Sequence, residues 1–219
     1  MKPRAIIFDA YGTLFDVHSI VHRVPGISGD LPALSLLWRQ KQVEYTWRRA
    51  LMKRYVDFWQ VTGEALRSAA NQLRINIPEE ARSSLMEAYL SPGILADVRT
   101  GLGALKQFPL AILSNGSPRM IDAAARANGL EPYFTHVISV DAVKTYKPSP
   151  EVYELGSSAL GQPAENVLFV SSNAWDAAGA KAFGYRVGWC NRSGDAVDCL
   201  GFDPDFTVSG LDQIGSALE

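Results

Sequence analysis

The sequence has little cysteine and no strong excess of charge of either sign. Cys190 and Cys199 are the only cysteines among 219 residues, which excludes the disulfide framework of a small secreted domain. Two cysteines at this spacing also match no metal-ligand pattern, so we expect plain thiols. The net charge is −2 at pH 7, and the basic residues are scattered along the chain. This argues against nucleic acid as a partner.

Long hydrophobic runs are also missing. The first apolar stretch, Ala5–Phe8, stops at Asp9, far short of the length of a signal h-region or a membrane span. We therefore expect a cytoplasmic protein with no membrane contact. No repeat or low-complexity tract is present, and 47% of the residues are hydrophobic, which is enough for a proper core.

Five short apolar runs predict buried strands of a parallel sheet, because each ends in a polar or glycine-containing segment. These runs are Arg4–Asp9, Leu110–Ser114, Val137–Val140, Val167–Ser171 and Arg186–Cys190. Helical stretches directly followed by glycine are expected at Pro118–Asn128, Pro150–Leu160 and Trp175–Phe183. The alternation predicts the α/β class, with a doubly wound, Rossmann-like parallel sheet as the core.

The pattern changes between residues 15 and 96, where no convincing strand appears. An apolar stripe at helical spacing predicts one long helix carrying Trp47, Leu51, Tyr55, Phe58 and Trp59. Two further helices are expected at Glu64–Arg74 and Glu79–Tyr89. We therefore predict an all-helical cap of residues 15–96, inserted into a catalytic core formed by residues 1–14 and 97–219.

Polar segments follow the predicted strands, at the edge where open α/β sheets bind ligands. They are Asp9-Ala10-Tyr11-Gly12-Thr13, Ser114-Asn115-Gly116-Ser117, Lys147-Pro148 and Ser171-Ser172-Asn173-Ala174-Trp175-Asp176. In order and spacing these four segments resemble the four motifs of the haloacid dehalogenase superfamily. The cap segment Leu37–Trp47 is similar to the L-2-haloacid dehalogenase branch in particular.

Asp9 is the predicted nucleophile. A carboxylate at the end of a buried strand, followed by a glycine-containing turn, is held deprotonated and aimed at a substrate. Alone, this pattern would more often be a turn or a helix cap, and the other three motifs reverse that preference. The resemblance implies that Lys147 keeps Asp9 ionised. It also implies catalytic roles for Thr13, Ser171, Asn173 and Asp176, with Asp176 as the base that activates water.

Two positions indicate the reaction class. Phosphatases of the superfamily have a second Asp where Tyr11 stands, and that acid protonates the leaving alkoxide. Halide departs without a proton, so a dehalogenase has no need of this acid. Magnesium-dependent relatives have another Asp where Ser172 stands, and a serine cannot replace that charged ligand. We therefore predict a dehalogenase with no metal or organic cofactor, and we disfavour a magnesium-dependent phosphatase or phosphonatase.

The substrate is expected to lie between the second strand and the cap. Ser114 and Asn115 can bind its carboxylate with side-chain and backbone donors, although Ser117 before Pro118 also fits a plain helix cap. Arg39 is suited to receive the departing halide, because its guanidinium is permanently charged and rich in donors.

Aromatic side chains complete the predicted substrate site. Tyr11 is expected to contact the substrate, and Trp175 and Trp59 to form an apolar wall around the halogen. Aromatic residues at helical spacing more often belong to the core, which makes Trp175 the better supported of the two. The resemblance implies a hydrogen bond from Tyr153 in the site, while a partly buried helix tyrosine is the alternative.

The resulting prediction is a two-step hydrolysis. Asp9 displaces halide from C2 of a small (S)/L-2-haloalkanoic acid with inversion, and water then hydrolyses the aspartyl ester to release the (R)/D-2-hydroxy acid. Fluoroacetate stays open as a substrate, and a catalytically silent binding protein is the alternative from another class. An α/β-hydrolase is excluded, because the chain has no G-x-S-x-G elbow. The resemblance also implies a homodimer.

Overall fold

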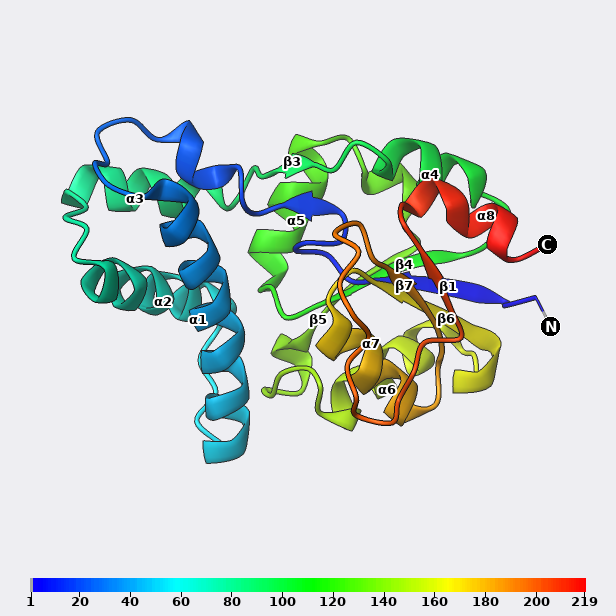
Figure 1. Cartoon of the computed structure of the whole chain (residues 1–219). Coiled ribbons are helices and arrows are strands. Elements are labelled where there is room, and N and C mark those ends of the chain that lie inside the picture. Colours follow the sequence, from blue (N-terminus) through cyan, green and yellow to red (C-terminus); the bar gives the residue numbers. More distant parts are fainter. Residues whose placement is uncertain (1) are drawn as a thin grey trace.

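The computed structural model describes residues 2–219 and places a body of sheet and helices beside a smaller group of helices (Figure 1). The sheet has six strands in the order β5-β4-β1-β6-β7-β8, and every neighbouring pair is parallel. The strands are β1 (Ala5–Phe8), β4 (Leu110–Ser114), β5 (His136–Ser139), β6 (Val167–Ser171), β7 (Arg186–Cys190) and β8 (Phe206–Val208). The predicted α/β class is confirmed, with β8 as an edge strand that the sequence pattern did not indicate.

The central strand β1 positions the residue that follows it. Ile6 aligns with Leu110 of β4 on one side and with Leu168 of β6 on the other. The chain crosses to opposite sides of β1, which makes the carboxyl end of this strand a topological switch point, where α/β sheets bind their ligands. Asp9 directly follows β1 and therefore lies at this point.

Three helices of the sheet-containing body match their predictions closely. They are α5 (Pro118–Ala127), α6 (Pro150–Leu160) and α7 (Ala174–Phe183). Left-handed glycines end two of them, since Gly161 has φ 59° and Gly184 has φ 115°. Short elements that were not predicted are α4 (Val98–Ala104), α8 (Ile214–Ala217) and the 3₁₀ turns Ile20–Arg23, Glu131–Tyr133, Val140–Ala142, Ala164–Asn166 and Leu211–Gln213.

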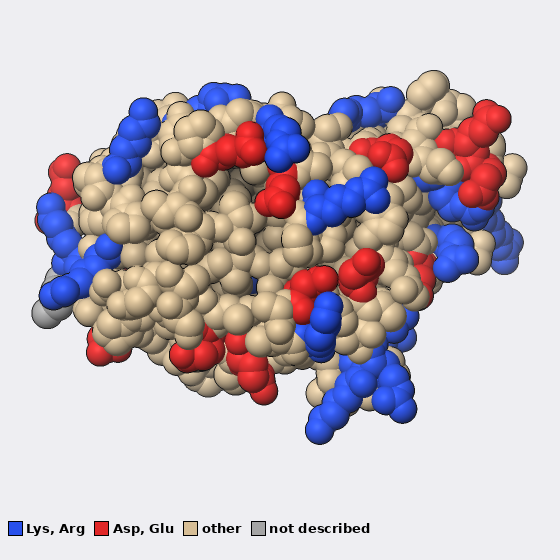
Figure 2. Space-filling model, turned by 180° about the vertical axis from the view of Figure 1, so that it is seen from behind, with Lys and Arg blue, Asp and Glu red and all other residues tan. Residues whose placement is uncertain are grey.

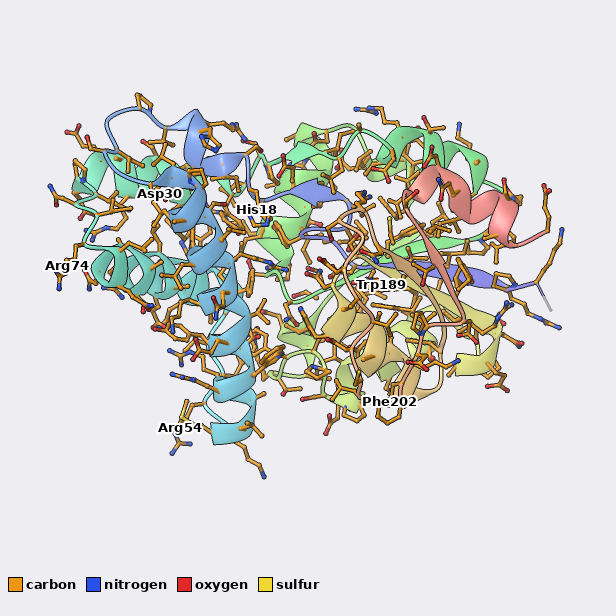
Figure 3. All side chains as sticks on the ribbon, in the orientation of Figure 1. His18, Asp30, Arg54, Arg74, Trp189 and Phe202 are labelled. Carbon is orange, nitrogen blue, oxygen red and sulfur yellow. The ribbon has the colours of Figure 1, made fainter. Side chains whose placement is uncertain are left out.

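The smaller group consists of α1 (Leu31–Met52), α2 (Phe58–Leu73) and α3 (Glu79–Ala88). Asp30, labelled in Figure 3, caps α1 by accepting a hydrogen bond from the Ala33 N–H. The predicted single helix through Trp47 and Phe58 is wrong. The helix α1 ends at Met52, Lys53 is left-handed with φ 54°, and Asp57 caps the start of α2 by accepting from the Gln60 N–H.

The apolar stripe predicted through Trp47 and Leu51 is also wrong. Trp47 is 37% exposed and Leu51 is 85% exposed, so the stripe does not face the core. The face of α1 that is buried instead carries Leu34, Trp38, Gln42 and Thr46. Two of these residues are polar, which is why an apolar pattern did not find that face.

Two very short strands join the helical group to the sheet. Antiparallel pairing connects β2 (Phe15–Asp16) to β3 (Gly93–Ile94). The prediction that residues 15–96 hold no strand is therefore wrong at both ends of that segment, because two-residue strands leave no periodicity to detect. The pair lies beside both proposed boundaries of the cap, and the division of the chain into cap and core stays a prediction.

Charge and cysteine are distributed as the composition indicated. On the face shown in Figure 2, basic and acidic side chains are mixed, with one basic group at the protruding end of α1. Cys190 is buried and Cys199 is exposed, and both are free thiols, as predicted. Within residues 2–219, no helix combines the length and hydropathy that a membrane crossing requires.

Candidate active site

A buried lysine between two carboxylates forms the centre of the site. The Nζ atom of Lys147 lies 3.0 Å from Oδ1 of Asp9 and 2.8 Å from Oδ2 of Asp176. Lys147 and Asp176 are fully buried, whereas Asp9 keeps 6% of its surface exposed. Three motif residues that the sequence separates by up to 167 positions thus meet at the carboxyl edge of β1 and β6.

The second oxygen of Asp9 is held by neutral donors. Thr13 donates its hydroxyl proton to Oδ2 over 2.9 Å, and Asn173 donates from Nδ2 over 2.8 Å. Thr13 itself accepts a hydrogen bond from the Ser172 N–H at 2.9 Å. Donors that surround a carboxylate fix its direction, as a nucleophile requires.

Asp176 has the more strongly perturbed environment. Burial raises the pKa of its carboxyl to about 6, against the opposing effects of the Lys147 ammonium and a 2.8 Å hydrogen bond from the Tyr153 hydroxyl. Burial alone would lower the pKa of Lys147, but the two carboxylates outweigh it and raise that pKa above its usual value. The Lys147 ammonium is thus the shared counter-ion of the Asp9 and Asp176 carboxylates. Because the pKa of Asp176 is near 6, its carboxyl can exchange a proton near neutral pH.

Local hydrogen bonds shape the loop after β6. Ser171 accepts a hydrogen bond from the Asn173 N–H at 3.1 Å, and Asn173 stands directly before α7. This turn points the Asn173 amide at Asp9, and the first helical turn carries Asp176. Ser171 therefore acts on Asp9 through Asn173.

The loop after β4 lies on the other side of Lys147. Asn115 accepts a hydrogen bond from the Lys147 N–H at 3.0 Å, and Ser114 accepts one from the Gly116 N–H at 3.0 Å. Ser117 occupies the cap position of α5 but its side chain makes no capping hydrogen bond. The plain side-chain cap considered for Ser117 is therefore wrong, because the Met120 N–H, which such a cap could accept, donates to the Ser117 backbone carbonyl oxygen at 3.0 Å instead.

Arg39 reaches the site from α1. Its Nη2 donates to the Tyr11 carbonyl oxygen at 3.0 Å and lies 3.5 Å from Oδ1 of Asn173. On the same side, the Trp175 ring meets Trp47 edge to face, with 5.6 Å between the ring centroids. The helical group therefore closes over the loops after β1 and β6.

Tyr11 stands in an aromatic cluster at the junction of the two groups of elements. Its ring contacts Phe15, Phe58 and Tyr89 at centroid distances of 5.8, 6.1 and 5.7 Å. Its hydroxyl is buried without a hydrogen-bond partner anywhere in residues 2–219, and burial raises the pKa of this phenol far above its usual value. A neutral, unpartnered O–H donor is thus held beside the site.

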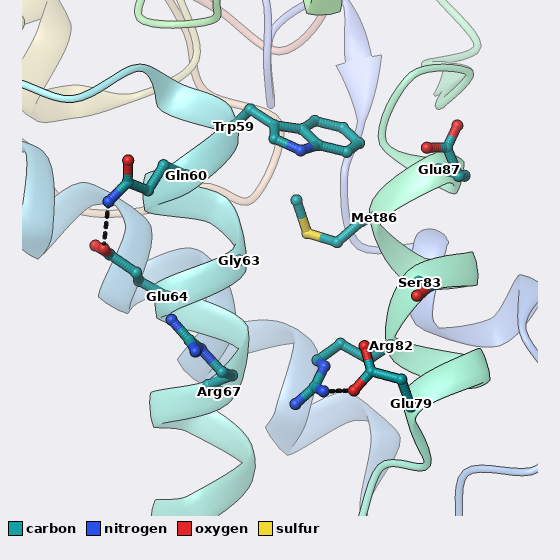
Figure 4. A pocket seen from close by; sticks show the side chains of 10 residues that line it. All are labelled: Trp59, Gln60, Gly63, Glu64, Arg67, Glu79, Arg82, Ser83, Met86 and Glu87. Atoms are coloured by element: carbon teal, nitrogen blue, oxygen red, sulfur yellow. Dashed lines mark hydrogen bonds and ion pairs between the residues drawn. The ribbon is translucent and has the colours of Figure 1, made fainter.

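Trp59 lies away from this cluster. Its ring covers the Arg119 guanidinium at 5.2 Å and lines a surface groove between α2 and α3, where it points toward Met86 (Figure 4). The aromatic side chain of this turn that contacts Tyr11 is the neighbouring Phe58. The structure therefore brings Phe58, and not Trp59, into contact with a motif residue, because periodicity does not fix the rotation of a helix whose start is unknown.

Comparison with known proteins agrees with this arrangement. A family model described as a haloacid dehalogenase-like hydrolase matches residues 3–184. The chain belongs to the haloacid dehalogenase-like hydrolases. Its identity to haloacetate dehalogenase H-2 of Moraxella sp. (strain B) is 49%, over 97% of this chain and 96% of that protein. Its identity to the (S)-2-haloacid dehalogenase of Pseudomonas sp. (strain YL) is 47%, over 99% and 94%.

A solved structure extends the comparison to three dimensions. The L-2-haloacid dehalogenase of Xanthobacter autotrophicus with chloropropionic acid covalently bound superposes with a TM-score of 0.90 at 37% identity, over 99% of this chain and 98% of that one. The L-2-haloacid dehalogenase branch indicated by the motifs and by the cap segment is thereby confirmed.

In this haloacid dehalogenase-like hydrolase, few side chains near Asp9 could act as metal ligands. Among residues 2–219, no group of three or more His, Cys, Asp or Glu side chains is arranged to hold a metal ion. The two carboxylates of the site, Asp9 and Asp176, share the Lys147 ammonium as their common partner.

Sequence reasoning missed two residues in contact with the motif residues. The apolar pattern predicts a helix-stripe position for Phe58 and gives no sign of its contact with Tyr11. The motifs do not include Arg192, which lies two residues beyond the end of β7 and contacts Thr13 and Ser172. Its place just beyond the carboxyl end of a strand was the signal that could have found it.

Proposed function

We propose that this protein hydrolyses small (S)-2-haloalkanoic acids to (R)-2-hydroxy acids, with inversion at C2 and an ester intermediate on Asp9. The observation that carries the proposal is the Asp9 carboxylate, held by Lys147 on one oxygen and by Thr13 and Asn173 on the other. Relatives named (S)-2-haloacid dehalogenase and haloacetate dehalogenase support this reaction class.

In the first step an oxygen of Asp9 bonds to C2 while the carbon–halogen bond breaks, and halide leaves with the bonding electron pair. The carboxylate attacks from the side opposite the halogen, so C2 is inverted. The structure with chloropropionic acid covalently bound supports an intermediate of this kind. Lys147 is assigned to hold the Asp9 carboxylate in a fixed direction before the attack.

Substrate binding is assigned to groups around the small exposed part of Asp9. Ser114 and Asn115 are placed at the substrate carboxylate, since Ser114 ends β4 and Asn115 follows it in the loop before α5. Arg39 is placed at the halide. In the described part of the chain its hydrogen bonds run only from Nη2, so Nε and Nη1 are left for an anion. Trp175 is placed in the apolar wall around the halogen, and Tyr11 is placed in contact with the substrate.

In the second step water attacks the carbonyl carbon of the Asp9 ester, and the 2-hydroxy acid leaves with its oxygen from Asp9. Asp176 is assigned as the acceptor of the water proton, which its pKa of about 6 allows near neutral pH. This proton passes to the departing alkoxide oxygen, and the second water proton goes to solvent as the Asp9 carboxylate is restored. Tyr153 and Lys147 hold the Asp176 carboxylate in place.

Three further parts of the proposal rest on the family resemblance and on the site. The reaction is proposed to need no metal, because the Lys147 ammonium stands between the two carboxylates. The working unit is proposed to be a homodimer in the cytoplasm. The division into a cap of residues 15–96 and a core of residues 1–14 and 97–219 is proposed on the basis of the β2–β3 junction.

A halide-release screen tests the function. The substrates are both enantiomers of 2-chloropropionate, chloroacetate and fluoroacetate, in buffer with EDTA. We expect release from (S)-2-chloropropionate and chloroacetate, none from the (R) enantiomer, and none from any substrate with Asp9→Ala or Asp9→Asn. Release that depends on added Mg²⁺, or that survives in either variant, would contradict the proposal.

Two alternatives have their own outcomes in this screen. Fluoride release would extend the substrate range to fluoroacetate, which the relative named haloacetate dehalogenase makes worth including. Hydrolysis of an aryl phosphate with Mg²⁺, and no halide release, would identify a phosphatase on the same fold.

A further inference from the structure

Arg192 contacts both loops that surround Asp9. It lies two residues beyond the end of β7, and its guanidinium is partly buried. Nη2 donates to the Thr13 carbonyl oxygen at 3.0 Å, and Nη1 donates to the Ser172 hydroxyl oxygen at 2.7 Å. Thr13 follows β1 and Ser172 follows β6, so one side chain joins the carboxyl ends of the two central strands.

Asp97 anchors this guanidinium from the other side. Nη2 of Arg192 lies 2.8 Å from Oδ2 of Asp97, and Nε lies 3.1 Å from each carboxylate oxygen. The Leu211 N–H also donates to Oδ2. Burial would raise the pKa of Asp97, but the Arg192 and Leu211 hydrogen bonds outweigh it and hold that pKa below its usual value. The carboxylate is therefore a fixed, charged anchor.

The contacts of Arg192 continue to the nucleophile. The Thr13 hydroxyl donates to Asp9 at 2.9 Å, and the Ser172 N–H donates to that same hydroxyl oxygen at 2.9 Å. Arg192 thus binds the backbone of Thr13 and the side chain of Ser172. These are the two residues whose hydrogen bonds hold the Thr13 hydroxyl that orients Asp9. Trp189, labelled in Figure 3, holds Ser172 from β7 by donating to its carbonyl oxygen at 3.2 Å.

We infer that Arg192, fixed by Asp97, is a positioning residue for the Asp9 nucleophile: it sets the distance between the loops after β1 and β6. This inference rests on the proposed dehalogenase reaction. Arg192 contacts a carbonyl oxygen, a hydroxyl and a carboxylate, and none of the reacting atoms. The planar fork of Arg reaches these three acceptors together, whereas a lysine ammonium in its place keeps the charge but not the fork.

Arg192→Lys is the decisive variant, and Lys181→Met is its matched control. Lys181 pairs with Asp205 at 2.8 Å, and Asp205 also accepts a backbone hydrogen bond, from the Val187 N–H, as Asp97 does from Leu211. The control therefore changes another ion-paired basic residue without touching either loop.

With (S)-2-chloropropionate, we expect Arg192→Lys to lower kcat about 10- to 100-fold while KM changes about threefold or less, because a misplaced nucleophile slows the chemical step. Lys181→Met should keep wild-type values of both. Amide hydrogen exchange should accelerate in residues 10–15 and 171–176 of Arg192→Lys and stay unchanged there in the control.

Each result then has a definite meaning. Wild-type kcat in Arg192→Lys, or an equal fall of kcat in both variants, would overturn the inference. Unchanged exchange in the two loops would also overturn it. If the wild-type protein releases no halide, the proposed function fails, and the exchange comparison still decides whether Arg192 holds the two loops in place.

Discussion

Replacement of Lys147 by methionine should destabilise the fold in a strongly pH-dependent way. Methionine fills a similar volume in this fully buried position but leaves Asp9 and Asp176 without their shared cation. Because both carboxylates lie about 3 Å from the same Nζ atom, their nearest oxygens are at most about 6 Å apart. Two unit charges at that distance repel by about 3 kcal/mol at an effective dielectric constant near 20.

The loss of attraction adds to this repulsion. Removing one partner from a buried ion pair costs about 3–5 kcal/mol, a large part of the 5–15 kcal/mol that keeps an ordinary domain folded. We therefore expect the free energy of unfolding of Lys147→Met to be about 3–5 kcal/mol lower than that of the wild type at pH 8. The control Lys181→Met loses an ion pair whose side chains are about a third exposed, so its loss should be about 1 kcal/mol or less.

The pH dependence follows from Asp176. Burial raises its pKa from 3.8 to about 6 in the folded protein, so between these values the folded state binds more protons than the unfolded state. The contribution of this group to stability therefore falls as the pH rises through that window. Without the Lys147 cation the pKa rises further and the window extends upward. The deficit of Lys147→Met should thus be smaller at pH 5 than at pH 8.

Urea unfolding at pH 5 and pH 8 measures this directly for the wild type, Lys147→Met and Lys181→Met. Asp9→Asn combined with Lys147→Met should recover part of the loss at pH 8, since it removes one of the two repelling charges. A deficit that stays constant or grows as the pH falls would refute the electrostatic account of the cluster. So would a double variant that is no more stable than Lys147→Met.

Three further predictions test other parts of the structure. Tyr153→Phe removes a hydrogen bond that lowers the pKa of Asp176, so the acidic limb of a kcat/KM profile should move to higher pH; an unmoved limb would count against Asp176 as the base. Gly179→Ala places a Cβ 2.5 Å from Pro148 and 2.6 Å from the Tyr153 hydroxyl and should cost about 1–3 kcal/mol in thermal or urea unfolding. Gly103→Ala has open space around its Cβ and should not lower the free energy of unfolding. Gln42→Leu breaks buried hydrogen bonds to Thr62 and Tyr89 and should cost about 2–3 kcal/mol. Leu51 is 85% exposed, so the free energy of unfolding of Leu51→Ala should stay within about 0.5 kcal/mol of the wild type. Equal losses in Gln42→Leu and Leu51→Ala would contradict the assignment of Gln42 to the buried face of α1.

The buried sheet was predictable because its strands need continuous apolar runs. Leu110–Ser114 and Val167–Ser171 match β4 and β6 residue for residue. The helical group was harder, because the apolar spacing through Trp47 and Phe58 continues by coincidence across a break. Only the left-handed Lys53 and the capping Asp57 reveal that break. Asp57 is a good helix cap in principle, but one polar residue does not outweigh a regular apolar pattern.

The active site was also predictable only in part. Asp9, Lys147 and Asp176 could be named from motifs, since strand ends converge at one edge of a parallel sheet. Their shared hydrogen bonds, and the burial that shifts the pKa of Asp176, depend on contacts between distant segments. The contacts of Arg192 with Thr13, Ser172 and Asp97 likewise join positions far apart in the chain. Such long-range pairs leave no local pattern, which is why Arg192 was missed while Asp9 was not.

The origin of the product oxygen tests the covalent role of Asp9 most directly. With enzyme in excess over (S)-2-chloropropionate in ¹⁸O-enriched water, a single turnover should give a 2-hydroxy acid without the heavy isotope. Mass spectrometry of the peptide that contains Asp9 should then find ¹⁸O in its carboxylate. Heavy oxygen in the first-turnover product, with an unlabelled Asp9, would show that water attacks C2 directly and would contradict the account.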